Sequence, residues 1–137
     1  MAEGYYSSFC AYINKQRPDI IGHFDLLTKF EEQHPLFLEN PDYRALSIRY
    51  ALLAAESGAI FEVNTGAIAR GYRTMPYPHT DILYALKNAG ARVMLCSDCH
   101  HARMLDFAFD EVKALLKDIG FSSLVTLHGG VFTDEDI

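Results

Sequence analysis

The sequence predicts an α/β fold in which parallel strands alternate with flanking helices. Short apolar runs of the buried parallel-strand type alternate with longer segments of helical pattern. Polar residues gather directly after several of these apolar runs. Strands that are separated by helices of this length indicate βα units and a parallel sheet. Because 137 residues is the size of one domain, we expect residues 1–137 to form a single domain.

Two helices are expected in the first half of the chain. The first covers residues 3–16, and Pro18 ends it because proline cannot continue a helix. The second covers residues 42–57, with Asn40 or Pro41 near its start.

Two further helices are expected in the second half. One covers residues 79–89, where Thr80 or His79 could cap the start. The other is an amphipathic helix over residues 103–118 that ends before Gly120.

The strands are expected to bring the polar residues of the chain together. We predict strands at residues 19–22, 59–64, 92–97 and 123–127. Between them lie a loop with a short helix at 24–40 and a long loop at 65–78. In parallel α/β folds, chemistry occurs on the loops after the carboxyl ends of strands. The polar residues at those places are His23, Asp25, Asn64, Arg70, Arg73, Asp98, His100 and His101.

Composition excludes several classes of protein. The net charge of −6 argues against a nucleic-acid or anionic-membrane partner. No apolar run approaches the roughly 20 residues that cross a bilayer, and the first residues do not form a signal peptide. Cys10, Cys96 and Cys99 are too few for a disulfide framework, so we expect a cytoplasmic protein.

Asp98 and His100 are candidate metal ligands. In an extended segment their side chains would point the same way, and a carboxylate beside an imidazole suits a divalent metal ion. A buried hydrogen bond between them, or a helix N-cap by Asp98, is the structural alternative. His23 follows a buried strand and could be a ligand that Asp25 orients, or the reverse, although a lone histidine there often has only a structural role.

Three other features carry a chemical and a structural interpretation. Arg70 and Arg73 lie in a loop where arginine could grip a phosphate through two parallel hydrogen bonds, or could simply be solvated. Glu62 sits in an otherwise apolar strand, so its carboxylate needs a partner and could anchor the site. Cys96 and Cys99 have C-x-x-C spacing, but a cysteine at the end of a buried strand is better interpreted as a small hydrophobe.

Four segments taken together resemble the PHP (polymerase and histidinol phosphatase) family, and its histidinol-phosphatase branch most. They are, in order, Gly-His-Phe-Asp at 22–25, Glu-Val-Asn-Thr-Gly at 62–66, Tyr-Pro-x-x-x-Ile-Leu at 77–83 and Ser-Asp-x-His at 97–100. The resemblance implies a distorted βα barrel with a cluster of divalent metal ions, commonly zinc, iron or manganese. Residues 1–137 would be the C-terminal half of that barrel.

The resemblance also implies a set of functional residues. His23, Asp98 and His100 match metal ligands of the family, and Arg70 and Arg73 lie where the family places an arginine that grips phosphate. The implied activity is metal-dependent hydrolysis of a small phosphorylated substrate. That reaction is conversion of histidinol phosphate to histidinol in histidine biosynthesis.

The sequence departs from the family in one large respect. The family has a His-x-His segment and further ligands, including a metal-bridging glutamate, that this sequence does not contain. The alternative is therefore a catalytically incomplete fragment that self-associates through open sheet edges. We expect the chain alone to be a weak or inactive phosphatase, and to pair with a missing N-terminal half or form a homo-oligomer.

Overall fold

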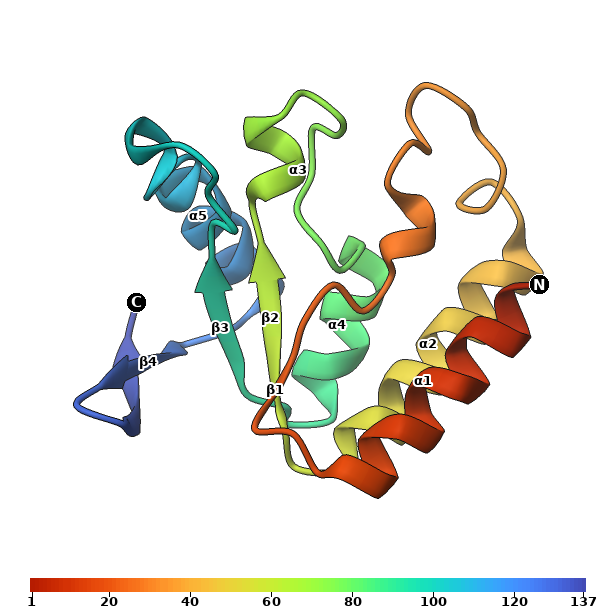
Figure 1. Ribbon diagram of the computed structural model, residues 1–137, viewed down its shortest axis with the longest axis horizontal. Coiled ribbons are helices and arrows are strands. Elements are labelled where there is room, and N and C mark those ends of the chain that lie inside the picture. The colour runs from red at the N-terminus through yellow and green to blue at the C-terminus, as the bar shows by residue number, and fades with distance from the viewer.

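The computed structural model describes residues 1–137 and has a mixed α/β fold (Figure 1). Its central sheet consists of β1 (Ile20–Ile21), β2 (Ile60–Asn64) and β3 (Val93–Cys96), in the order β1-β2-β3. Both neighbouring pairs are parallel. The predicted alternation of parallel strands with helices is therefore confirmed for this part of the chain.

Four longer helices form a row beside the sheet. They are α1 (Ala2–Gln16), α2 (Pro41–Ala55), α4 (Thr80–Asn88) and α5 (Phe109–Ile119). Each packs against the next, α1 on α2, α2 on α4 and α4 on α5 (Figure 1). The hydrophobic core between this row and the sheet includes Tyr6, Phe24, Phe61, Val63, Leu83, Leu86 and Leu116, all essentially buried.

Local signals in the sequence set the ends of the helices. Asn40 caps α2, because its side-chain oxygen accepts hydrogen bonds from the backbone N–H groups of Asp42 and Tyr43. His79 caps α4 in the same way through Nδ1, which accepts from the N–H of Asp81. Both caps agree with the residues that the sequence indicated.

The predicted helix over residues 103–118 is wrong at its start. A short 3₁₀ helix, η2 (Ala102–Met104), comes first, and α5 begins only at Phe109. Ala108 between them has a left-handed backbone with φ of 60°. A helix cannot continue through that conformation, so the apolar periodicity overestimated its length.

The predicted strand at 123–127 exists, but it is not part of the parallel sheet. It is β4 (Ser123–His128), which pairs antiparallel with β5 (Val131–Asp136), a strand that the sequence analysis missed. Gly129 and Gly130, with φ of 57° and 82°, make the tight turn between the two strands. The acidic end of β5 lacks the apolar alternation that identifies a strand.

The carboxyl ends of the parallel strands meet at one edge of the sheet. In Figure 1 the arrowheads of β2 and β3 point to this edge, where α3 (Gly66–Ala69) and the loop after β3 lie. The 3₁₀ helix η1 (Leu26–Thr28) follows β1. The three-stranded sheet does not close into a barrel. No helix has both the length and the apolar character needed to span a membrane.

Candidate metal and phosphate site

His23 and Asp98 meet at the carboxyl edge of the sheet. Nε2 of His23 lies 3.4 Å from Oδ2 of Asp98. Both residues have a left-handed backbone, with φ of 48° and 45°, which is uncommon outside glycine and costs up to roughly 1–2 kcal/mol each, less for Asp, whose short polar side chain tolerates it. Two strained residues that face one another point to a functional site rather than to a requirement of the fold.

Glu62, on β2, anchors His23. Its Oε2 accepts the backbone N–H of His23 at 3.0 Å and lies 3.2 Å from the imidazole Nδ1. Asn64 holds the other oxygen, since its Nδ2 donates to Oε1 at 3.0 Å. A Cβ at Gly22 would lie only 3.2 Å from Oε2, so the absence of a side chain there leaves room for the carboxylate. The structural anchor that the sequence indicated at Glu62 is confirmed.

Asp25 does not orient His23, so that one of the alternative interpretations is wrong. Its side chain is fully buried, and Oδ2 accepts the backbone N–H of His79 at 2.9 Å. The left-handed backbone at His23 turns the chain between the two residues. Spacing along the sequence therefore predicted the wrong carboxylate partner for the imidazole.

His23 and its two carboxylate neighbours, Glu62 and Asp98, stabilise one another's charged forms. The hydrogen bond with Glu62 raises the pKa of His23 above its ordinary value, although burial opposes this, and Asp98 adds to the effect. Burial alone would raise the pKa of Glu62, but the hydrogen bonds from His23 and Asn64 outweigh it and lower that pKa. At neutral pH the imidazole therefore lies between two ionised carboxylates.

Arg70 binds Asp98 from the side of α3. Its Nη2 donates to Oδ2 of Asp98 at 3.0 Å, and its Nη1 donates to the backbone carbonyl of the same residue at 3.1 Å. A Cβ at Gly66 would lie 2.7 Å from Nη2 and 2.8 Å from the backbone carbonyl oxygen of Ser97, so glycine at this position leaves room for the guanidinium and for the loop after β3. Burial would raise the pKa of Asp98, but the bonds from Arg70 outweigh it and lower that pKa.

Arg73 lies in a different, buried network. Its Nη1 donates to Oγ1 of Thr28 at 2.8 Å and lies 4.0 Å from Oδ2 of Asp25. The guanidinium also lies over the ring of Tyr77, 4.5 Å from its centroid. The structure thus brings Arg70, and not Arg73, into contact with the His23–Asp98 pair.

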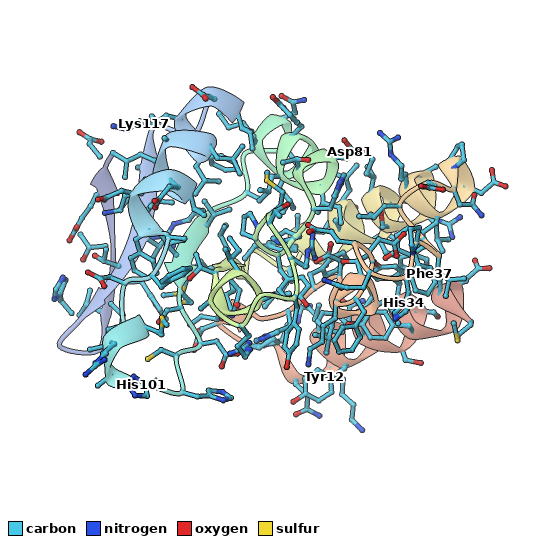
Figure 2. The ribbon with its side chains drawn as sticks, turned by 90° about the horizontal axis from the view of Figure 1, so that it is seen from above. Tyr12, His34, Phe37, Asp81, His101 and Lys117 are labelled. Atoms are coloured by element: carbon cyan, nitrogen blue, oxygen red, sulfur yellow. The ribbon has the colours of Figure 1, made fainter.

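The two histidines after Asp98 differ in position. Nε2 of His100 lies 3.6 Å from Oδ1 of Asp98, and 76% of its side chain is exposed. The backbone between them is not extended as we expected, because Asp98 is left-handed. His101 is exposed, and its Nδ1 accepts the N–H of Arg103. Seen from above, His101 and His34 lie toward opposite ends of the molecule (Figure 2).

His23, Asp98 and His100 lie together at one end of the sheet, as we expected. The distances between their side-chain atoms can be compared with those between ligands of one metal ion. Two ligand atoms that bind one ion at about 2.0–2.2 Å lie roughly 3.0–3.5 Å apart. The contacts of Asp98 with His23 (3.4 Å) and with His100 (3.6 Å) are close to this separation. No three His, Cys, Asp or Glu side chains are grouped closely enough to surround one ion. The residues fit parts of a ligand shell, and metal binding by them stays a prediction.

The cysteines contribute no second site. Cys10, Cys96 and Cys99 are free thiols. Burial, with Glu62 and Asp98 adding to it, raises the pKa of Cys96 to about 11. A thiol with that pKa is almost entirely protonated at neutral pH and reacts poorly as a redox centre. The interpretation of Cys96 as a small hydrophobe agrees with this environment.

Comparison with known proteins supports a distant relationship to histidinol phosphatases. A protein of Schizosaccharomyces pombe named probable histidinol-phosphatase is 30% identical over 120 residues. The matched region covers 86% of this chain but 39% of the relative, so the chain spans well under half of that protein's length. No protein-family profile matches the chain.

Proposed function

We propose that this chain forms part of the active site of a metal-dependent phosphomonoester hydrolase that acts on histidinol phosphate. The contact between His23 and Asp98 carries the proposal, because two strained residues present an imidazole and a carboxylate at 3.4 Å. The name of the S. pombe relative supports the phosphatase class and the substrate. We further propose that residues 1–137 correspond to the C-terminal half of a PHP-type barrel in a cytoplasmic enzyme.

Each side chain of the site has a proposed role. His23, Asp98 and His100 would hold divalent metal, as zinc, manganese or iron. A metal ion bound there would polarise a phosphoryl oxygen and lower the pKa of a bound water. Glu62 fixes the imidazole of His23, because its Oε2 lies 3.2 Å from Nδ1, and Nε2 is left facing the site.

Arg70 is the proposed phosphate ligand. Its guanidinium already uses two donors on one neighbour, the geometry with which arginine binds two phosphate oxygens. Arg73 is not proposed to bind phosphate, because its guanidinium is buried against Thr28 and Tyr77.

The second candidate function is a catalytically incomplete domain that assembles with another chain or with a copy of itself. The grouping of candidate ligands favours it, because no three of them surround one point. In addition, β1 has a single neighbour in the sheet, β2, so its other edge has no strand partner.

One assay separates the two candidates. Purified chain is given histidinol phosphate with Mn²⁺, Zn²⁺ or Fe²⁺, and phosphate release is compared among the wild type, Asp98→Asn and His128→Ala. His128 is an exposed histidine of β4 and serves as the control. We expect metal-dependent release slower than about 1 s⁻¹, lost in Asp98→Asn and unchanged in His128→Ala. Release that is equal in the wild type and Asp98→Asn would contradict the hydrolase and favour the incomplete domain.

A further inference from the structure

We infer that Arg70 occupies Asp98 in place of a metal ion, and that metal and phosphate binding are coupled because Arg70 must move from Asp98 to the phosphate. The inference rests on the proposed function, since it requires both ligands at this site. It adds a property that the proposed function does not contain, namely that each ligand strengthens binding of the other.

Two groups, Arg70 and His23, contact the same oxygen of Asp98. Oδ2 of Asp98 accepts from Nη2 of Arg70 at 3.0 Å and lies 3.4 Å from Nε2 of His23. A cation bound between Asp98 and His23 would need that same oxygen. It would also bring a second positive charge close to the guanidinium, which is unfavourable at such a distance. Metal binding therefore competes with the Arg70–Asp98 ion pair.

The guanidinium of Arg70 has hydrogen bonds to Asp98 alone. Both hydrogen bonds of its guanidinium go to Asp98, one to the carboxylate and one to the backbone carbonyl. The side chain is partly exposed, and the left-handed Gly71 follows it at the end of α3. Arg73, in contrast, is almost fully buried between Thr28 and Tyr77. Arg70 is thus able to leave its partner without breaking the core.

A phosphate group can replace the two hydrogen bonds that Arg70 loses when it leaves Asp98. Two phosphate oxygens accept the two donors of the guanidinium in parallel, at least as strongly as one carboxylate and one carbonyl oxygen. Phosphate would draw Arg70 away and free Oδ2 of Asp98, while a metal ion on Asp98 would free Arg70 for phosphate. Because binding free energies are linked, the two effects must be equal in size.

The test measures metal affinity rather than activity. Free Mn²⁺ is counted by electron paramagnetic resonance during titration of the purified full chain, with and without inorganic phosphate. The variants are Arg70→Gln and, as a matched control, Arg92→Gln, which breaks an exposed ion pair with Asp134. We expect phosphate to tighten Mn²⁺ binding at least about fivefold in the wild type and in Arg92→Gln. Arg70→Gln should bind Mn²⁺ more tightly than the wild type without phosphate. It should gain less from phosphate than the wild type, because only direct contact between phosphate and metal remains.

The outcomes separate this inference from the proposed function. Mn²⁺ binding by the wild type that phosphate does not change, or a phosphate effect as large in Arg70→Gln as in the wild type, overturns the coupling through Arg70 and leaves the metal site standing. Failure of both proteins to bind Mn²⁺ at any phosphate concentration overturns both proposals. Binding by Arg70→Gln alone supports the inference.

A second measurement does not depend on the folding of any variant. The Nε–H resonance of Arg70 in the wild type should shift when Zn²⁺ and phosphate are added together. An unchanged resonance at saturating Zn²⁺ and phosphate would mean that Arg70 stays on Asp98, and would overturn the inference.

Discussion

Two aspartate–arginine pairs lie at the carboxyl edge of the sheet, with the same residue types in opposite environments. In one pair, 33% of the Asp98 side chain and 29% of the Arg70 side chain are exposed, and Nη2 lies 3.0 Å from Oδ2. In the pair of Asp25 and Arg73 only 1% and 2% are exposed, and the contact is 4.0 Å. The comparison teaches that burial, rather than residue type, separates an ion pair that holds the fold from one that is open to a ligand.

The buried pair depends on several partners. Oδ2 of Asp25 accepts from the backbone N–H of His79 and lies 3.3 Å from the hydroxyl of Thr28, while Oδ1 has no partner. Burial raises the pKa of Asp25, and Arg73 opposes that effect. These contacts join η1 and the loop after α3 to the start of α4.

The largest effect is expected from Arg73→Met. Removing one partner of a buried ion pair leaves an uncompensated charge, which costs about 3–5 kcal/mol of the free energy of unfolding. Urea denaturation measures this loss, and the double variant Arg73→Met with Asp25→Asn should recover part of it. A loss of less than about 1 kcal/mol in the free energy of unfolding would mean that Arg73 contributes no more to stability than a solvated surface arginine.

The next effect is a gain in stability from Asp98→Gly. Glycine removes up to roughly 1–2 kcal/mol of strain at φ of 45°, and the exposed pair with Arg70 that is lost is worth about 0–1 kcal/mol. We therefore expect a net increase of up to about 1 kcal/mol in the free energy of unfolding, together with weaker Mn²⁺ binding. The control is Asp98→Asn, because asparagine tolerates the left-handed backbone. A lower free energy of unfolding in Asp98→Gly would mean that Asp98 stabilises the fold.

Arg70→Met is expected to change stability less than Arg73→Met. A partly exposed ion pair such as Arg70–Asp98 contributes about 0–1 kcal/mol, so the urea midpoint should move little. Equal losses in the two arginine variants would remove the distinction on which the comparison rests.

The smallest effect concerns pH. His23 has a raised pKa, so its protonated form contributes stability that is fully present below the unfolded value of about 6.5. That contribution is lost as pH rises through the higher folded pKa. In metal-free buffer, the wild type should therefore lose up to about 1 kcal/mol relative to His23→Gln as pH rises above about 6.5. A difference that stays constant from pH 5 to pH 9 would contradict the Glu62–His23 contact.

Much of the fold could be predicted because its signals are local. Apolar runs identified β1, β2 and β3, and residues such as Asn40 marked where a helix begins. The meeting of His23 with Asp98 follows from the geometry of parallel strands, whose carboxyl ends share one edge.

The remaining features depend on backbone conformations that these local patterns did not indicate. The left-handed residue Ala108 turns the chain where periodicity predicts that the helix continues, and the left-handed His23 turns it directly after the predicted strand at 19–22. Gly71, also left-handed, lies between Arg70 and Arg73, and the two guanidinium groups end in different environments. The sequence did not distinguish the two arginines, because burial depends on residues far away along the chain.

The most direct test of the account is a crystal structure of the chain with Mn²⁺ and phosphate, in which the metal is located by anomalous scattering. The account predicts an anomalous peak about 2.0–2.3 Å from Nε2 of His23 and from a carboxylate oxygen of Asp98. Arg70 should then contact phosphate instead of Asp98. No peak at saturating Mn²⁺, with the Arg70–Asp98 ion pair intact, would contradict the account.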